Sequence, residues 1–182
     1  MVTLVMAELD SPIGVIRLAA TEVGLCALNF ADRWESARHY LERRFGQLNF
    51  TSQVNPHGAV SELGRYLDGD MTALERIAVD PGGSAFQQKV WTALREIRVG
   101  TTTSYGDLAC RIGHPQGPRA VGAANGQNPV SIVIPCHRVI AANGSLHGYG
   151  GGLERKRWLL MHEGASTECL PGCVKYPMEA VK

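Results

Sequence analysis

The pattern of apolar residues changes at residues 80–84 (DPGGS), and this change most restricts what the chain can fold into. Before this segment, short β-prone runs alternate with turn signals; after it, apolar residues recur every three or four positions, as on a helix. Proline and adjacent glycines favour a linker. A chain of 182 residues can form two small domains with modest cores. We therefore predict domains at 1–80 and 84–164, followed by a flexible tail at 165–182.

Residues 1–80 are predicted to form an α/β scaffold domain, a small mixed sheet with helices. The runs that read as strands are VTLVMAEL, GVIRLAA, GLCALNF and, at 76–80, RIAVD. Helical spacing of apolar residues appears in two segments, 32–45 and 59–69. This part of the sequence holds no cluster of catalytic side chains, so its expected role is structural support.

Residues 84–164 are predicted to form a mainly α, winged-helix-like domain. Ser84 and Gln87 make a capping box at the start of a first helix. Two short helices, at 104–113 and 118–126, are joined by a glycine-containing turn, which is the outline of a helix-turn-helix. The segment VSIVIPCHRVI (130–140) is predicted to be extended, Asn143-Gly144 signals a hairpin, and a last helix follows at 153–164.

The second helix of this predicted motif is rich in small residues, namely Ala120, Gly122, Ala123, Ala124 and Gly126. Such a surface lets the backbone approach another molecule closely. Tight packing against a neighbouring helix explains the same composition, and the residues alone favour packing.

The charge of the chain is unevenly divided. Residues 1–83 carry 7 Lys/Arg against 11 Asp/Glu, whereas residues 84–164 carry 9 against 4. This imbalance suggests a polyanion such as nucleic acid, although chance scatter of surface charge explains it equally well. No apolar run approaches the roughly 18 residues of a membrane span, and the N-terminus has neither a basic start nor a cleavage site. We expect a cytoplasmic protein that does not contact membranes.

The five cysteines form an odd, irregularly spaced set, which argues against a disulfide framework. Cys26 and Cys110 lie inside apolar patterns and are interpreted as buried structural thiols. Cys169 and Cys173 alone are a weak signal for zinc.

Cys136 differs from the other cysteines because of its neighbours. Pro135 stiffens the chain before it, and His137 and Arg138 follow at once. A reactive thiol needs a base, a cation or oriented N–H groups nearby. Adjacent side chains on a strand point to opposite faces, so His137 can serve Cys136 only through a turn or a bridging water.

A catalytic imidazole also needs a third group that selects its tautomer. The sequence offers Glu163, Asp107 and Glu154, and spacing does not choose among them.

The segment from Phe86 to Gly164 resembles the O6-alkylguanine-DNA alkyltransferases, also called methylated-DNA–protein-cysteine methyltransferases. The resemblance rests on PCHRV, preceded by RAVGAANGQNPVSIVI and followed by GYGGGLERKRWLLMHEG. The N-terminal part, with SPIG and YLDGD, resembles the scaffold domain of that family more loosely.

The resemblance implies a role for each matching residue. Cys136 is expected to accept the alkyl group, with His137 as base through a bound water and Glu163 orienting the imidazole. Tyr105 is expected to crowd the target phosphate and to assist protonation of the departing guanine at N3. Asn128 is expected to brace the turn that carries the cysteine.

For DNA, the resemblance implies that the small-residue helix enters the minor groove and that Arg119 replaces the extruded nucleotide in the base stack. The expected DNA contacts are Arg119, Tyr105, Ala120, Gly122, Ala123 and Gly126. The expected pocket around the flipped base consists of Tyr149, Gly150, Val139 and Ser131. Ser131 stands where some relatives have proline.

The implied function is direct repair of O6-alkylguanine, and of O4-alkylthymine, by one irreversible transfer per chain. The implied protein is a monomer that needs no cofactor and no metal. Zinc in the N-terminal domain is not expected, because residues 1–83 offer only Cys26, His39 and His57 as soft ligands.

Two rival functions remain. A DNA-binding protein that senses alkyl lesions without chemistry is disfavoured, because relatives of that kind lack the cysteine. A cysteine hydrolase is disfavoured because the members of a Cys–His dyad normally come from distant positions.

Overall fold

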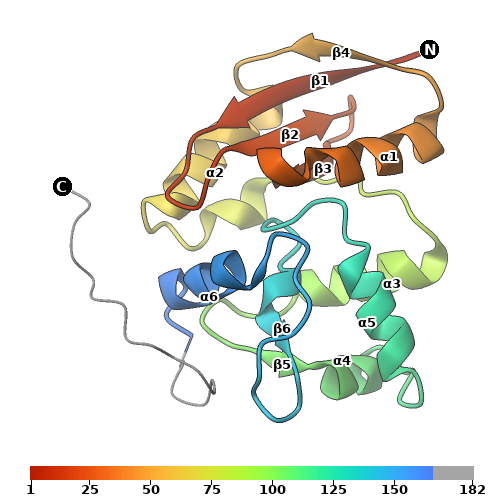
Figure 1. Cartoon of the computed structure of the whole chain (residues 1–182), viewed down its shortest axis with the longest axis vertical. Coiled ribbons are helices and arrows are strands. Elements are labelled where there is room, and N and C mark those ends of the chain that lie inside the picture. The colour runs from red at the N-terminus through yellow and green to blue at the C-terminus, as the bar shows by residue number, and fades with distance from the viewer. Residues whose placement is uncertain (166–182) are drawn as a thin grey trace.

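A computed structural model describes residues 1–165 (Figure 1). Its N-terminal part is a four-stranded mixed sheet in the order β3-β2-β1-β4. The strands are β1 (Val2–Leu9), β2 (Ile16–Ala20), β3 (Leu25–Phe30) and β4 (Leu48–Ser52). Strand β1 pairs antiparallel with β2 and parallel with β4. This confirms the predicted mixed sheet with helices.

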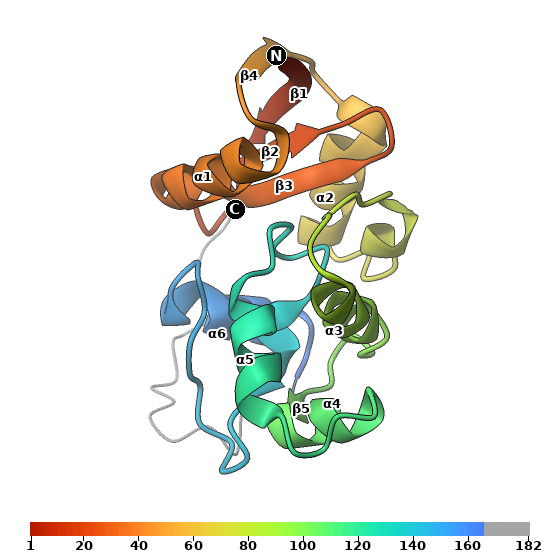
Figure 2. The same cartoon turned by 90° about the vertical axis from the view of Figure 1, so that its right-hand side faces the viewer.

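The sheet buries both faces because its strands alternate two sets of apolar residues. Leu4, Ala19 and Ala27 pack with Leu41 of helix α1 (Trp34–Phe45). The other set, which includes Leu18 and Leu28, packs with helix α2 (Ala59–Leu67) and with the C-terminal part of the chain. Figure 2 shows this second part directly beneath the sheet. One continuous core therefore joins the two halves.

Two features of the N-terminal part differ from the sequence-based expectation. Strand β4 was not predicted, because LNFTS is short and its alternation rests on only two apolar residues, Leu48 and Phe50. It forms a strand by pairing with β1. The segment 76–80 is not a strand. Its first residue, Arg76, is the last residue of the 3-10 helix η3 (Ala73–Arg76). Val79 makes only an isolated bridge to Leu25.

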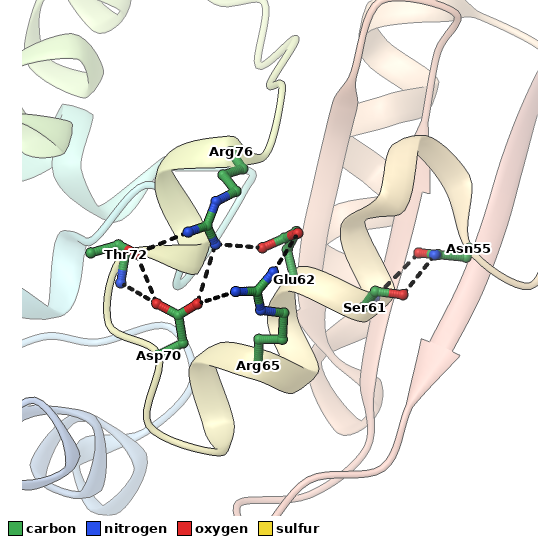
Figure 3. A network of polar contacts seen from close by, with 7 residues as sticks. All are labelled: Asn55, Ser61, Glu62, Arg65, Asp70, Thr72 and Arg76. Atoms are coloured by element: carbon green, nitrogen blue, oxygen red, sulfur yellow. Dashed lines mark hydrogen bonds and ion pairs between the residues drawn. The ribbon is translucent and has the colours of Figure 1, made fainter.

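A surface network of polar side chains joins α2 to η3 (Figure 3). Arg76 pairs with Glu62 and Asp70 at 3.0 and 3.3 Å, and Arg65 pairs with Asp70 at 2.7 Å. Thr72 donates its hydroxyl to the same Asp70 carboxylate. We call these five residues the exposed network.

The C-terminal part is mainly helical, as predicted. Its helices are α3 (Ala85–Arg95), α4 (Tyr105–Arg111), α5 (Pro118–Gly126) and α6 (Leu153–His162), with a 3-10 turn, η4, at Cys136–Arg138. Strands β5 (Thr103–Ser104) and β6 (Val139–Ile140) pair in parallel. The predicted capping box of Ser84 and Gln87 is present. Helices α4 and α5 form the helix-turn-helix.

The segment that leads to Cys136 is not extended, contrary to the prediction from its β-branched residues. It folds into consecutive tight turns, with Val133 N–H donating to Ser131 O and Ile134 N–H to Val130 O. Ile132 has a φ of 70°, which is a strained value for a β-branched residue. Backbone hydrogen bonds between Leu28 and both Pro129 and Ser131 hold this segment against β3.

Two smaller expectations also fail. Cys110 is exposed, not buried, because α4 turns Leu108 and Ala109 inward and leaves Cys110 on its outer side. Asn143-Gly144 makes a turn, but residues 145–152 form no strand that could pair with β6, so no hairpin forms. No helix within residues 1–165 is long and apolar enough to cross a membrane.

Candidate functional site

Cys136 opens the 3-10 turn η4 and is buried, with 6% of its surface exposed. It lines a cavity of about 520 Å³. Burial raises the pKa of its thiol, while a hydrogen bond with the Asn128 side chain and the charge of Lys156 act in the opposite direction. The resting group is therefore a thiol that needs a base before it can act as a nucleophile.

His137 is fully buried beside Cys136. Its Nε2 lies 3.0 Å from Glu163 Oε1, which selects the neutral tautomer with the proton on Nε2. Its Nδ1 is buried and has no hydrogen-bond partner within residues 1–165. Burial lowers the pKa of the imidazole, more than Glu163 raises it. His137 is thus a neutral imidazole with a basic nitrogen available.

Glu163 holds this arrangement by accepting four hydrogen bonds. Arg138 donates Nε to Oε2 at 2.9 Å and Nη2 to Oε1 at 2.8 Å, and Tyr66 donates its hydroxyl to Oε1 at 2.9 Å. Burial raises the pKa of Glu163, but the contacts with His137 and Arg138 outweigh it and bring the pKa to about 2. We call His137, Arg138, Glu163 and Tyr66 the buried network.

The other two acids that sequence reasoning left open do not reach His137. Asp107 accepts from Ser104 at the exposed start of α4, and Glu154 pairs with the Arg157 side chain at 2.9 Å.

Sequence reasoning missed two residues of this site. Tyr66 lies on the buried face of α2, where an aromatic residue reads as core, and it is 97 positions from Glu163. Lys156 is fully buried and donates to the carbonyls of Val139 and His147 at 2.7 and 2.9 Å. Burial lowers its pKa to about 8. No local signal separates Lys156 from the half-buried Arg155 and Arg157 on either side of it.

Asn128 braces the turns before Cys136. Its Nδ2 donates to Ile134 O at 2.7 Å, and its Oδ1 accepts from Val130 N–H at 3.0 Å. One amide side chain thus ties both ends of a five-residue segment that contains the strained Ile132.

The small residues of α5 are divided between two environments. Val121 and Ala124 are buried, whereas Arg119, Ala120, Ala123 and Gly126 are exposed. Gly122 faces Tyr105, because a Cβ at this position would lie 3.6 Å from the tyrosine ring. Burial raises the pKa of Tyr105. The exposed residues are open to another molecule, so packing within the fold does not account for them.

The predicted pocket residues are only partly brought together. Tyr149, Gly150 and Ser131 line the cavity at Cys136, whereas Val139 does not. Tyr105, expected to contact DNA and the departing base, does not line it either. The loop that carries Tyr149 is held against the N-terminal sheet. Gly151 has no room for a Cβ between the rings of Phe30 and Tyr149.

No group of three or more potential metal ligands occurs in the part of the chain that the structure describes. Cys169 and Cys173 lie outside the described residues.

The fold and the site define a class of protein in which a helix-turn-helix stands beside a buried cysteine–histidine–glutamate array. Two family models cover nearly all of the described chain. They are the ribonuclease-like domain of 6-O-methylguanine DNA methyltransferase at residues 4–81 and its DNA binding domain at residues 85–165. The chain therefore belongs to the 6-O-methylguanine DNA methyltransferase family.

Individual relatives agree with this assignment. The methylated-DNA–protein-cysteine methyltransferase of Mycolicibacterium paratuberculosis is 47% identical over 157 residues, which are 85% of this chain and 88% of the relative. The crystal structure of Mycobacterium tuberculosis O6-methylguanine methyltransferase has a TM-score of 0.73 at 40% identity, covering 88% of this chain and 93% of that one. The crystal structure of Mycobacterium tuberculosis OGT in complex with DNA also has a TM-score of 0.73, at 38% identity, and covers 92% of this chain and 96% of that one.

Proposed function

We propose that this chain repairs DNA by moving an alkyl group from O6-alkylguanine, and from O4-alkylthymine, to Cys136. One observation carries the proposal: the buried network orients the imidazole next to Cys136, the only cysteine within residues 1–165 that lines the cavity, in a chain of the methyltransferase family. In this proposal residues 1–80 support the site and residues 84–164 bind DNA and accept the alkyl group.

The first step is removal of the thiol proton. His137 is neutral, and its free Nδ1 faces no protein partner within the described residues, so it takes the Cys136 proton through a bound water. The product is an imidazolium beside the Glu163 carboxylate. Since the pKa of Glu163 is about 2, that carboxylate is ionised at neutral pH and stabilises the new cation.

The second step is displacement at the alkyl carbon. The thiolate forms a C–S bond while the C–O6 bond breaks, and its electron pair leaves with the guanine. Tyr105 assists protonation of the departing base at N3. The thioether has no good leaving group for water, so each chain reacts once and needs no cofactor or metal.

The target must leave the duplex before it can reach a buried thiol, which takes a few kcal/mol. We propose that the exposed small-residue face of α5 enters the minor groove and that Arg119 fills the space of the flipped nucleotide. We further infer that the chain acts as a monomer in the cytoplasm.

The function is tested by the intact mass of the protein after incubation with a duplex that contains O6-methylguanine. The expected result is a gain of one methyl per chain, with no further product once the protein is consumed. No gain of mass supports a lesion sensor, and product in excess of protein supports a hydrolase; either result contradicts the proposal. Cys136→Ala is the matched control, which is expected to bind the duplex and to gain no methyl.

The role of Arg119 is tested with two substrates. Arg119→Ala is expected to slow repair of the duplex strongly while sparing reaction with free O6-methylguanine, which needs no flipping. For lesions opposite a poorly pairing base, Arg119→Ala is expected to slow repair less, because extrusion of the nucleotide already takes less energy. Equal losses on duplex and free base contradict insertion and place Arg119 in the fold or the chemical step.

A further inference from the structure

The cavity at Cys136 continues away from the site along one side of helix α1. Arg33, which immediately precedes the helix, and Ser36, Tyr40 and Arg43 within it recur every three or four positions and line the cavity. The segments 125–129 and 148–150 of the C-terminal part line it as well. The lining residues of α1 extend over roughly 15 Å at the rise of an α-helix. The two halves of the chain thus enclose one elongated cleft that starts at the reactive thiol.

This cleft offers more space than a methyl group requires. In an in-line displacement the sulfur, the alkyl carbon and O6 lie on one axis, so the rest of the alkyl group extends to the side and needs room there. A volume of about 520 Å³ is within the range of pockets that hold drug-sized ligands. The cleft reaches α5 only at its C-terminal end, at Asn125 and Gly126, so of the expected DNA contacts it includes Gly126 alone and not Arg119 or Ala120.

The cleft is positively charged. Arg33 and Arg43 line it, and no aspartate or glutamate of the described residues does. Neither arginine has an ion pair with another described residue. The nearest acids along the chain are engaged elsewhere, since Asp32 pairs with Arg155 and Glu42 pairs with Arg38.

Two residues that line the cleft also carry a buried polar atom without a partner. Asn125 is only 4% exposed, and its Oδ1 has no hydrogen bond within residues 1–165; the same is true of the Tyr149 hydroxyl. Both residues line the cleft. Buried polar groups are almost always hydrogen-bonded, so each of these atoms requires a partner from outside the described chain, a water molecule or a ligand. Asn125 Oδ1 is an acceptor and is satisfied only by a donor, not by an anion.

We propose that the cleft binds the distal end of long alkyl adducts and selects those that end in a carboxylate. The Arg33 and Arg43 guanidinium groups attract the anion and donate hydrogen bonds to it. This inference rests on the proposed function, because the adduct reacts by the same step. The Cys136 sulfur bonds to the first carbon of the chain, the C–O6 bond breaks, and the guanine leaves with the electron pair and is protonated.

The test compares two duplexes that differ in one group, with O6-(carboxypentyl)guanine in one and the neutral carboxamide, O6-(carbamoylpentyl)guanine, in the other. Single-turnover rates at low ionic strength are divided by the rate of the same protein on O6-methylguanine. The wild type is expected to prefer the carboxylate about fivefold or more, as two partly exposed charge pairs allow. In Arg33→Gln/Arg43→Gln this preference is expected to fall to about one.

The matched control is Arg38→Gln, on the same helix. Arg38 does not line the cleft; together with Glu42 it lines a different hollow. The preference for the carboxylate is therefore expected to remain in this variant. A wild-type preference of one, an unchanged preference in the double variant, or an equal fall in Arg38→Gln overturns the inference. If the wild type fails to react with O6-methylguanine as well, the proposed function fails; if it reacts and shows no preference, only the cleft assignment fails.

Discussion

Helix α2 contributes to two networks of arginine and carboxylate that differ mainly in their contact with water. Its outer face supplies Glu62 and Arg65 to the exposed network, where the arginine side chains are 45–55% exposed (Figure 3). Its inner face supplies Tyr66 to the buried network, where the side chains of His137 and Glu163 are fully buried. The distances within the two networks are similar, at 2.7–3.6 Å and 2.8–3.0 Å.

The comparison shows that geometry alone does not determine what an ion pair contributes. In the exposed network, water solvates each partner when the other is removed, so single changes have small effects. In the buried network, removal of one partner leaves a charge without solvent or counter-ion, which is strongly destabilising. The same isolation from water keeps His137 neutral, whereas the contacts with His137 and Arg138 outweigh the effect of burial and keep Glu163 ionised. Proton transfer from Cys136 requires both states.

The largest expected effect is that of Glu163→Gln. This change leaves Arg138 buried without its carboxylate and is expected to lower the free energy of unfolding by about 3–5 kcal/mol. Methyl transfer is expected to slow by at least about 100-fold, because His137 loses the group that stabilises its imidazolium. Denaturant unfolding and single-turnover kinetics measure both effects.

Glu62→Gln in the exposed network is the matched control. It is expected to change stability by less than about 0.5 kcal/mol and to leave the rate unchanged. Equal effects of the two substitutions contradict the distinction between the networks.

The next effect concerns the pH dependence of stability. The pKa of Glu163 falls from 4.5 to about 2 on folding, so its contribution is present above pH 4.5 and is lost as the pH falls toward 2. Folding lowers the pKa of His137 from 6.5. As the pH falls, this imidazole is therefore protonated in the unfolded chain before it is protonated in the folded chain, and the fold loses stability below pH 6.5. Urea unfolding between pH 7 and pH 3 is expected to show a steeper decline for the wild type than for Glu163→Gln below about pH 4.5. Parallel curves contradict a specific role of Glu163.

Tyr66→Phe is expected to have an intermediate effect. It removes one hydrogen bond to a charged acceptor and keeps the ring, so stability is expected to fall by about 1.5–3 kcal/mol. Methyl transfer is expected to slow only severalfold, with no change in affinity for duplex DNA, because Arg138 still holds Glu163. A rate equal to that of the wild type shows that the N-terminal part does not assist the chemistry.

The smallest effect is expected for Asp70→Asn in the exposed network. Although Asp70 contacts Arg65, Arg76 and Thr72, these side chains are exposed to solvent, so the melting temperature is expected to move by no more than about 2 °C. Differential scanning calorimetry measures the shift. A much larger shift shows that the exposed network acts as a cooperative unit.

Local patterns predicted the elements of the fold better than their assembly. The capping box at Ser84, the three N-terminal strands and the helix-turn-helix each depend on residues close in sequence, and all are present. Strand β4 depends on parallel pairing with β1 across about 40 residues, which no local pattern encodes. The turns around Ile132 depend on the Asn128 side chain, which overrides the β-branched residues.

The candidate site divides in the same way. The PCHRV motif identified Cys136 and His137, and its family resemblance pointed to Glu163, which the structure brings within hydrogen-bond distance of His137. The sequence does not identify Tyr66 as a site residue, because its ring packs in the core and only its hydroxyl reaches Glu163. The sequence does not predict the cleft along α1 either, because the cleft forms only where the two halves of the chain pack together. In the sequence alone, Arg33 and Arg43 are typical of surface charges.

The central claim is that the buried network keeps His137 neutral with Nδ1 unprotonated. Side-chain ¹⁵N NMR of the unreacted protein measures this directly, and His137→Gln assigns the signal among the six histidines. At pH 7 we predict a neutral imidazole with its proton on Nε2, and in Glu163→Gln a change in the tautomer population. An imidazolium at pH 7, or a neutral ring protonated on Nδ1, would contradict the account.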